Sequence, residues 1–305
     1  MGLIMRPYAG DADLSPIGEL IRALPAVGRH LVDFPWRLSG PVADSTLDAR
    51  VCMADGLLVG FAAWQDPWAT LDVYIRPGPS QPEVEAAIFD WAARRFREID
   101  AARGRPLPYW VEVCEDDTER LALLARHGYT VDDDYTYVMM SRSLVGPLSR
   151  PDLPPGFAIR PFAGASEVEA YVEMHRRAFE SVSMTAPWRA RTLRMPGYEP
   201  ELDLVAVAPD GRFAGFCVGW AAPKRRVAQI EPLGIDPAFQ GRGLAGALLL
   251  EMLARFKAHG AEHAQVETDS GRTPARHAYE AVGLLPVYQS PRKGQWFSRP
   301  DDGQD

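Results

Sequence analysis

Hydrophobic positions in the second half of the chain change spacing along the sequence, which predicts strands separated by helices. From about residue 243 to 259, apolar residues recur three and four positions apart, which indicates a helix with one buried face formed by Ala245, Leu248, Leu249, Met252, Leu253 and Phe256. Gly260 predicts the end of this helix. Shorter patterns predict helices over 166–179 and 274–281 and strands over 157–161, 203–208, 212–220, 227–236, 264–268 and 284–288. This order is typical of an α/β (α+β) domain with a mixed sheet.

The first half of the chain repeats this pattern in a weaker form. The stretch MRPYAG at 5–10 returns as IRPFAG at 159–164, and further short matches follow in the same order. Two copies indicate a duplicated domain rather than a solenoid. The proline-rich segment 146–156 predicts a linker between the copies. We therefore expect one domain over 1–145 and a second over 157–305.

Composition and charge exclude several classes of protein. The 305 residues are enough for two domains, and the formal net charge of −8 argues against nonspecific nucleic-acid binding and mildly favours a cationic acceptor. No apolar run is long enough to span a membrane, and the first residues lack the pattern of a signal peptide. Three widely spaced cysteines are typical of a reducing compartment. These features predict a cytoplasmic protein that does not bind membranes.

A glycine-rich loop, QGRGLAG at 240–246, lies between a predicted strand and the long helix. Its small residues allow close approach of the backbone to a ligand, and the free N–H groups that begin the helix favour an anion. Arg242 adds a cation, so the loop predicts a phosphate or pyrophosphate site. The loop also matches the dinucleotide fingerprint GxGxxG, but the segment DPAFQ at 236–240 stands before it and only about sixty residues follow it. A dinucleotide domain is therefore disfavoured.

Read as QxxGxA, residues 240–245 resemble the pyrophosphate-binding motif of the GNAT superfamily of N-acetyltransferases. The preceding LGIDP at 233–237 is similar to the strand that enters this motif, and AxxxYExxGL at 275–284 resembles the second motif of the family. The resemblance covers about residues 157–290, and the repeat extends a fainter form over 1–145. It implies two tandem GNAT-like acyl-CoA N-acyltransferase domains.

The resemblance also implies the residues that hold acetyl-CoA, the acyl donor and co-substrate. Backbone groups of Leu233, Gly234 and Ile235 would contact the pantetheine and the thioester. The pyrophosphate would lie on the loop formed by Gln240, Gly241, Arg242, Gly243, Leu244, Ala245 and Gly246. Arg272 stands where many members have asparagine, and could reach a phosphate instead. Pro232 predicts a bulge or a lost pairing where the family's strand splays to admit the pantetheine.

Two residues are candidates for catalysis. Tyr279 matches the family's general acid, although a core aromatic would fit the same helix. By strand alternation Glu231 shares a face with Leu233 and Ile235, and it would be either a general base or a structural carboxylate. Acceptor contacts are predicted, with a core role as the alternative, for Trp188, Tyr198, Asp203 and Trp220. No metal site is expected, because Gly260 separates the only paired histidines.

The first copy departs from these motifs. Gln240, Gly243 and Ala245 align with Ser80, Glu83 and Glu85, and Tyr279 aligns with Leu124. Carboxylates would repel a pyrophosphate, so the first copy is predicted to be a degenerate domain without a cofactor site.

Together these features predict an acetyl-CoA-dependent N-acetyltransferase that acts on a primary amine of a small molecule or peptide by direct attack in a ternary complex. The alternative is a non-catalytic acyl-CoA sensor or partner-binding module. A longer acyl donor would use the same contacts. The protein is expected to be a monomer or a homodimer.

Overall fold

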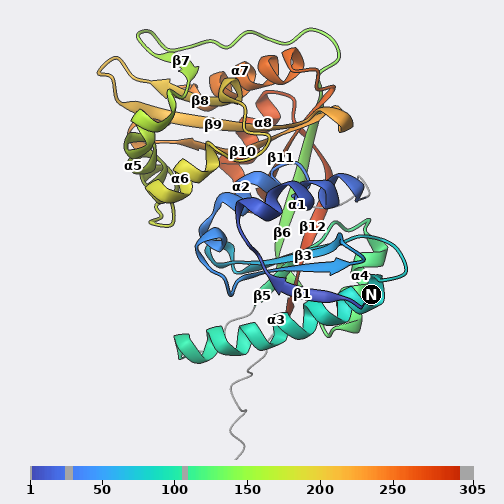
Figure 1. Ribbon diagram of the computed structural model, residues 1–305. Helices are drawn as coiled ribbons and strands as arrows, with labels where there is room; N and C mark the ends of the chain where they lie inside the picture. The colour runs from blue at the N-terminus through green and yellow to red at the C-terminus, as the bar shows by residue number, and fades with distance from the viewer. Residues whose placement is uncertain (1, 25–29, 105–108, 296–305) are drawn as a thin grey trace, which may run out of the picture. The chain divides into compact units, whose positions relative to one another are not determined.

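The computed structural model describes residues 2–24, 30–104 and 109–295, which fold as two compact units (Figure 1). Among these residues, unit 1 contains 2–24, 30–31, 40–104, 109–136 and 290–295. Unit 2 contains 32–39 and 137–289.

Unit 1 is a sheet with helices packed against it. Its strands, in sheet order, are β1 (Ile4–Pro7), β2 (Ala49–Ala54), β3 (Leu57–Gln65), β4 (Thr70–Ile75) and β5 (Tyr109–Glu112). The first four are antiparallel neighbours, and β5 runs parallel to β4. The helices are α1 (Asp11–Ala23), α3 (Gln81–Arg103) and α4 (Thr118–Arg126), with 3₁₀ turns at Pro41–Asp44 and Asp66–Trp68.

Unit 2 repeats this order of elements. Its strands are β7 (Ala158–Pro161), β8 (Asp203–Val207), β9 (Phe213–Ala222), β10 (Val227–Ile235) and β11 (His263–Asp269). Its helices are α5 (Val168–Phe179), α6 (Ala186–Thr192), α7 (Leu244–Ala258) and α8 (Thr273–Ala281). Four 3₁₀ turns lie at Gly164–Glu167, Pro200–Leu202, Pro223–Arg225 and Pro237–Phe239. The predicted fold class and the predicted duplication are therefore confirmed, and each strand and helix expected in the second copy is present.

Packing on the two faces of the unit 2 sheet explains the pattern of small and large residues. On β9, a Cβ atom at Gly219 would lie 2.4 Å from Phe256 of α7, so glycine is needed for the helix to approach this closely. On the opposite face, Phe216 packs against His175 and Tyr171 of α5. Helix α7 therefore packs on one face of β9 and helix α5 on the other, at positions of the same strand that point in opposite directions.

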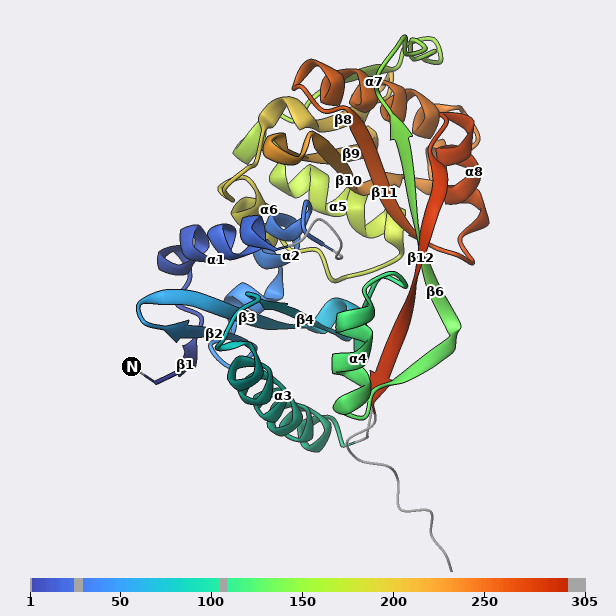
Figure 2. The same cartoon turned by 90° about the vertical axis from the view of Figure 1, so that its right-hand side faces the viewer.

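Three segments depart from the division at residues 146–156 that the sequence predicts. Strand β6 (Thr130–Ser143) begins in unit 1 and, from Tyr137, pairs antiparallel with β11 in unit 2. Strand β12 (Leu285–Gln295) begins in unit 2, and its residues 292–295 pair with β5 in unit 1 (Figure 2). The short helix α2 (Phe34–Ser39), from the first copy, belongs to unit 2. Each unit is thus completed by chain from the other copy.

Helix α2 is anchored in unit 2 by aromatic and hydroxyl contacts. The Trp36 ring lies 5.2 Å from that of Trp188, and the Trp188 indole N–H donates to Ser39 Oγ at 3.1 Å. Ser39 Oγ also lies 3.0 Å from the Thr192 hydroxyl. Because these groups are buried, their hydrogen bonds remove a desolvation penalty that would otherwise oppose folding.

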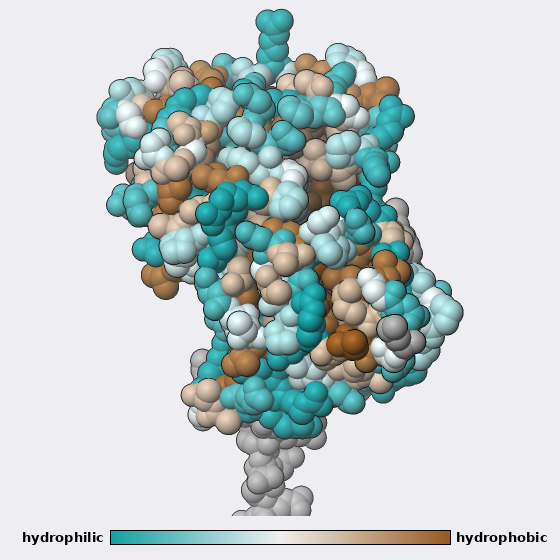
Figure 3. Space-filling model, in the orientation of Figure 1, coloured by the Kyte–Doolittle hydropathy of each residue, from teal (hydrophilic) through white to brown (hydrophobic). Residues whose placement is uncertain are grey.

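On the face of the molecule drawn in Figure 3, hydrophobic residues are interspersed with hydrophilic ones. All three cysteines are buried and free. Across the part of the chain that the structure describes, no helix is both long and apolar enough to cross a membrane.

Candidate active site in unit 2

The candidate site begins where two parallel strands diverge. β10 and β11 are paired from Val227 opposite His263 as far as Ile230 opposite Val266, and no further. At the same point the register between β10 and β9 shifts, between Ile230 and Leu233. The bulge predicted from Pro232 is therefore present, and beyond it the edge of β10 turns away from β11. A gap between strands exposes backbone groups that a bound ligand can satisfy.

The bulge interrupts the alternation from which the face of Glu231 is predicted. Ile230 and Leu233 lie opposite Gly219 and Cys217, which are two positions apart on β9 and share a face. One extra residue therefore stands between Ile230 and Leu233, and the face of Glu231 stays a prediction.

The glycine loop lies at the open end of β10, before α7. Gly241 and Gly243 have φ angles of 73° and 81°, a region that disfavours side chains with a Cβ atom. Gly243 is the N-cap of α7, no side chain caps this helix, and a Cβ atom added at Gly241, Gly243 or Gly246 would meet nothing within 4 Å. The loop therefore presents open space and the uncapped N–H groups of Leu244, Ala245 and Gly246, which suit an anionic group.

Asp236 fixes the backbone that leads into this loop. Its carboxylate accepts from the Ala238 N–H at 2.9 Å and from Arg177 Nε, at the end of α5, at 2.6 Å. Gln240 and Arg242 follow as exposed side chains, and the Gln240 amide donates to the Ile235 carbonyl at 3.4 Å. The arrangement leaves Arg242 available for a phosphate.

Backbone packing beside the gap requires glycine at position 234. A Cβ atom at Gly234 would lie 2.5 Å from the Phe216 ring and 3.1 Å from Ala178 of α5. Leu233 and Ile235, on either side of it, are half-buried against the core under α7. The three residues predicted to contact a thioester therefore form a closely packed edge.

Tyr279 of α8 and Glu231 of β10 are close enough for the charge of Glu231 to act on the Tyr279 hydroxyl. Tyr279, on α8, is only 6% exposed, and burial together with the charge of Glu231 raises the pKa of its hydroxyl. Because its pKa is raised, the hydroxyl stays protonated at neutral pH. No described residue hydrogen-bonds to it, so it remains available as a donor. Trp220 holds the backbone of Glu231 in place, because its indole N–H donates to the Glu231 carbonyl at 2.8 Å.

Arg272 lies at the N-cap of α8 and is exposed. Its guanidinium carbon is 5.8 Å from the centre of the Phe179 ring at the end of α5, and its charge reaches Tyr279. The structure thus brings Arg272 to the same site as Tyr279 and Glu231. His175 is a poor alternative base, because burial lowers its pKa to about 3.

The four predicted acceptor residues occupy different environments. Trp188, Asp203 and Trp220 are at most 2% exposed, whereas Tyr198 is half-buried and presents part of its ring to solvent. The Tyr198 hydroxyl donates to Asp203 Oδ2 at 2.7 Å, and its ring makes an edge contact with Trp220 at 6.5 Å. Tyr198 is therefore the only member of this set that is accessible to solvent to a substantial degree, and Asp203 and Trp220 contact it from the interior.

Sequence reasoning missed Arg189, the buried partner of Asp203. Both side chains are fully buried, and an Arg189 Nη donates to Asp203 Oδ2. The guanidinium lies 3.7 Å from the Tyr171 ring centre and 4.4 Å from that of Phe162, and the Asp203 charge raises the pKa of Arg189. An arginine among polar residues near a helix start gave no signal, because burial of a charge cannot be read from spacing.

The corresponding loop of unit 1 has a different character. Helix α3 begins at Gln81 with a proline in its first turn, and Glu85 is 8% exposed there. The Glu85 carboxylate accepts from the Gln81 amide at 3.0 Å and pairs with Arg126 of α4 at 3.3 Å. A carboxylate is therefore fixed where unit 2 presents open N–H groups.

No cluster of three or more metal-ligating side chains occurs among the residues described. The contacts above are instead those of an anion-binding loop, a strand gap and a tyrosine donor.

Comparison with known proteins agrees with this geometry. Residues 168–284 match the acetyltransferase (GNAT) family, a span that contains the strand gap, the glycine loop and Tyr279. A mycothiol acetyltransferase from Kineococcus radiotolerans is 31% identical over 288 residues, covering 91% of each chain. The chain belongs to the GNAT acetyltransferase family. The predicted family and the prediction of an N-acetyltransferase are thereby confirmed.

Other relatives extend the similarity over most of the chain. A mycothiol acetyltransferase from Geodermatophilus obscurus is 28% identical over 260 residues, covering 78% of each chain. A tandem GNAT protein from the clavulanic acid biosynthesis pathway has a TM-score of 0.66 at 18% identity, covering 98% of this chain and all of the other. A GCN5-related N-acetyltransferase from Sphaerobacter thermophilus has a TM-score of 0.63 at 21% identity, covering 97% and 96%. These structures share the fold of both units.

Proposed function

We propose that unit 2 transfers an acetyl group from acetyl-CoA to the primary amine of a small molecule, by direct attack in a ternary complex. The supporting observation is the meeting of three features at one place: the gap between β10 and β11, the uncapped start of α7 and the Tyr279 hydroxyl. In this proposal the pyrophosphate lies on the N–H groups of residues 241–246 and the pantetheine follows the free edge of β10.

The proposed reaction needs two protons removed from the acceptor ammonium and one proton supplied to the departing thiolate. The ammonium of the acceptor loses a proton to Glu231, directly or through water, and the free amine attacks the thioester carbonyl carbon. The carbon–sulfur bond breaks, Tyr279 protonates the departing thiolate, and the nitrogen of the new amide loses its second proton to the Tyr279 phenolate, directly or through water. The amide product and coenzyme A then leave, and Glu231 releases its proton to solvent.

The names of the curated relatives support a narrower acceptor. Since two of them are mycothiol acetyltransferases, we propose a mycothiol-related amine as the first acceptor to test. A screen would follow free thiol release from acetyl-CoA with this amine, simple primary amines and a peptide N-terminus. Turnover with an amine supports the proposed acetyltransferase activity. Saturable binding of acetyl-CoA without turnover on any amine would instead favour a non-catalytic sensor.

We further propose that unit 1 is the degenerate copy and lacks this activity. The fixed Glu85 carboxylate would repel a pyrophosphate. The proline in the first turn of α3 removes a backbone N–H donor from the same place.

Tyr279→Phe is expected to lower kcat by about 10²-fold, because the ring stays in place while the proton donor is lost. The dissociation constant of acetyl-CoA should stay within about twofold, since the proposed role of the hydroxyl is to protonate the thiolate that forms during the reaction. Steady-state kinetics and calorimetry check the two values. A fall in affinity with kcat unchanged would assign Tyr279 a binding role instead.

Glu231→Gln tests the base through its pH dependence. A base is needed only while the acceptor is an ammonium, so the loss in kcat/KM should be largest near neutral pH, about tenfold or more, and should shrink as pH approaches the amine pKa of about 10. Rate profiles of both proteins over this range measure the ratio. A structural carboxylate would give a ratio independent of pH, which contradicts the proposed role.

A further inference from the structure

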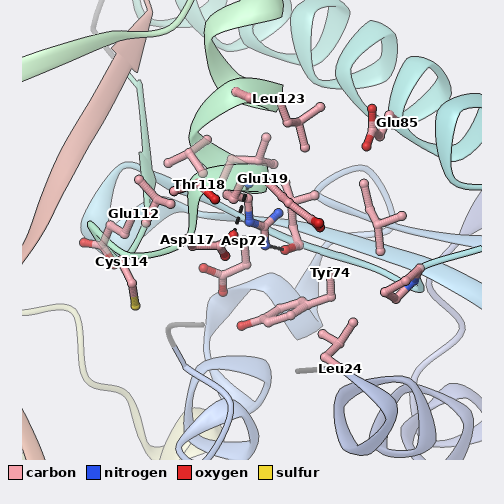
Figure 4. Close-up of a pocket in the computed structure, with 18 of the residues that line it drawn as sticks. Leu24, Asp72, Tyr74, Glu85, Glu112, Cys114, Asp117, Thr118, Glu119 and Leu123 are labelled. Atoms are coloured by element: carbon pink, nitrogen blue, oxygen red, sulfur yellow. Dashed lines mark hydrogen bonds between the residues drawn. The ribbon is translucent and has the colours of Figure 1, made fainter. Parts of the chain in front are cut away.

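Unit 1 contains a cavity at the place where its own parallel strands diverge. β4 and β5 share a single ladder pair, Thr70 opposite Trp110, and a cavity of about 710 Å³ opens beyond it (Figure 4). This volume lies within the range of about 300–1,000 Å³ common for small-molecule sites. The cavity is bounded by β4, the end of β5 and helix α4.

Arg120 blocks the part of this cavity that an acyl-CoA would need. Its guanidinium reaches from α4 across the gap and donates to the Val73 carbonyl of β4. The aligned residue of unit 2 is Ala275, whose side chain is too short to make the same contact with β10. In this family the pantetheine arm enters that gap. In unit 1 the Val73 carbonyl, which a cofactor would use as a hydrogen-bond acceptor, is already occupied by Arg120.

The lining of the cavity carries an excess of negative charge. Two guanidinium groups, Arg120 and Arg126, and the imidazole of His30 face six carboxylates: Asp72, Glu85, Glu112, Asp116, Asp117 and Glu119. The charges of Asp117 and Asp72 act on Arg120, and Glu112 lies 2.8 Å from the His30 ring. Even with His30 protonated the carboxylates outnumber the cations, which disfavours the phosphates of coenzyme A and favours a positively charged ligand.

The remaining walls suit the apolar part of such a ligand. Leu24, Leu71 and Leu123 contribute aliphatic surface, and Tyr74 contributes an aromatic ring (Figure 4). An aromatic face beside carboxylates attracts an ammonium through both its quadrupole and the neighbouring charge. Glu119 is exposed at the edge of the cavity, where it can meet an entering cation.

We infer that the unit 1 cavity is a binding site for a small organic cation, an amine with an apolar body, separate from the acyl-transfer site of unit 2. The duplicated domain has thus exchanged an anionic cofactor for a cationic ligand by filling the pantetheine gap with Arg120 and adding carboxylates around it.

Calorimetric titration with spermidine tests this inference on the full-length Gly243→Glu protein, in which the acetyl-CoA site of unit 2 is disabled. One saturable binding event per chain is expected, weakening as ionic strength rises. Glu119→Lys should weaken binding by about tenfold, because it replaces an attractive charge at the cavity edge with a repulsive one. Glu119 is exposed, so the substitution leaves the core of the unit intact.

Glu19→Lys is the matched control. It makes the same change in net charge at an exposed position of α1 outside the cavity, and should alter the affinity by less than about twofold because of salt screening. The inference is overturned by absence of saturable binding up to millimolar spermidine, or by equal effects of the two lysine substitutions.

Coenzyme A provides a second decisive titration. Coenzyme A is titrated into the Gly243→Glu protein with and without Glu119→Lys. If coenzyme A binds and its affinity changes with Glu119→Lys, the cavity accepts an anionic cofactor, which would also overturn the inference. Failure of acetyl transfer in unit 2 would affect neither titration, so the two proposals can fail separately.

Discussion

Gly243→Glu is expected to weaken acetyl-CoA binding by at least about 100-fold and to abolish acetyl transfer. Gly243 has a φ angle of 81° at the N-cap of α7, so any side chain with a Cβ atom strains the loop there. The new carboxylate would also stand beside the N–H groups proposed to bind the pyrophosphate, and like charges repel strongly at short range. Calorimetry with acetyl-CoA and the thiol-release assay measure both effects.

Gly243→Asn separates charge from strain in this experiment. Asparagine tolerates a positive φ better than other residues with a side chain and brings no charge. A Cβ atom at this position meets nothing within 4 Å, so the chain itself has room for it. The asparagine variant should therefore lose less than about tenfold in affinity. Equal affinity of the glutamate variant and the unsubstituted protein would mean that the pyrophosphate does not bind this loop.

Local patterns in the sequence were enough to predict the second copy. The spacing of apolar residues located α7, and Gly260, with a φ angle of 84°, ends that helix as predicted. Pro232 located the register shift in β10 because proline cannot donate to a ladder. Each of these signals depends on neighbours in sequence, which is why it could be recognised without the fold.

Long-range pairing was not predictable in this way. Nothing in Phe34–Ser39 shows that its tryptophan packs on Trp188, and no pattern in β6 or β12 shows that these strands serve both units. Alternation alone could not assign the face of Glu231, because a bulge adds one residue between Ile230 and Leu233. The Arg120 contact with Val73 was likewise not predictable. Alignment of the two copies shows which motif residues are lost, but not which side chain occupies the space they leave.

Arg189→Ala is expected to destabilise unit 2 by about 3–5 kcal/mol, because it leaves the Asp203 carboxylate buried without its cation. Both side chains of this pair are 0% exposed, and the guanidinium is enclosed by the Tyr171 and Phe162 rings, so water cannot replace it without rearrangement. The free energy of unfolding from urea denaturation measures the loss. Because Asp203 accepts the Tyr198 hydroxyl at 2.7 Å, the KM of the acceptor should rise while acetyl-CoA binding is retained.

Arg160 and Glu167 form a matched pair at the surface of the same unit. Their side chains are 39% and 20% exposed, and water can solvate either partner when the other is removed. Arg160→Ala should therefore cost no more than about 1 kcal/mol. The double variant Arg189→Met/Asp203→Leu should recover most of the stability lost in Arg189→Ala, because it removes the stranded charge and refills the space with apolar atoms. A small loss in Arg189→Ala, comparable to that of Arg160→Ala, would show that Asp203 finds another partner or a proton. The buried pair would then serve to position Tyr198 rather than to hold unit 2 together.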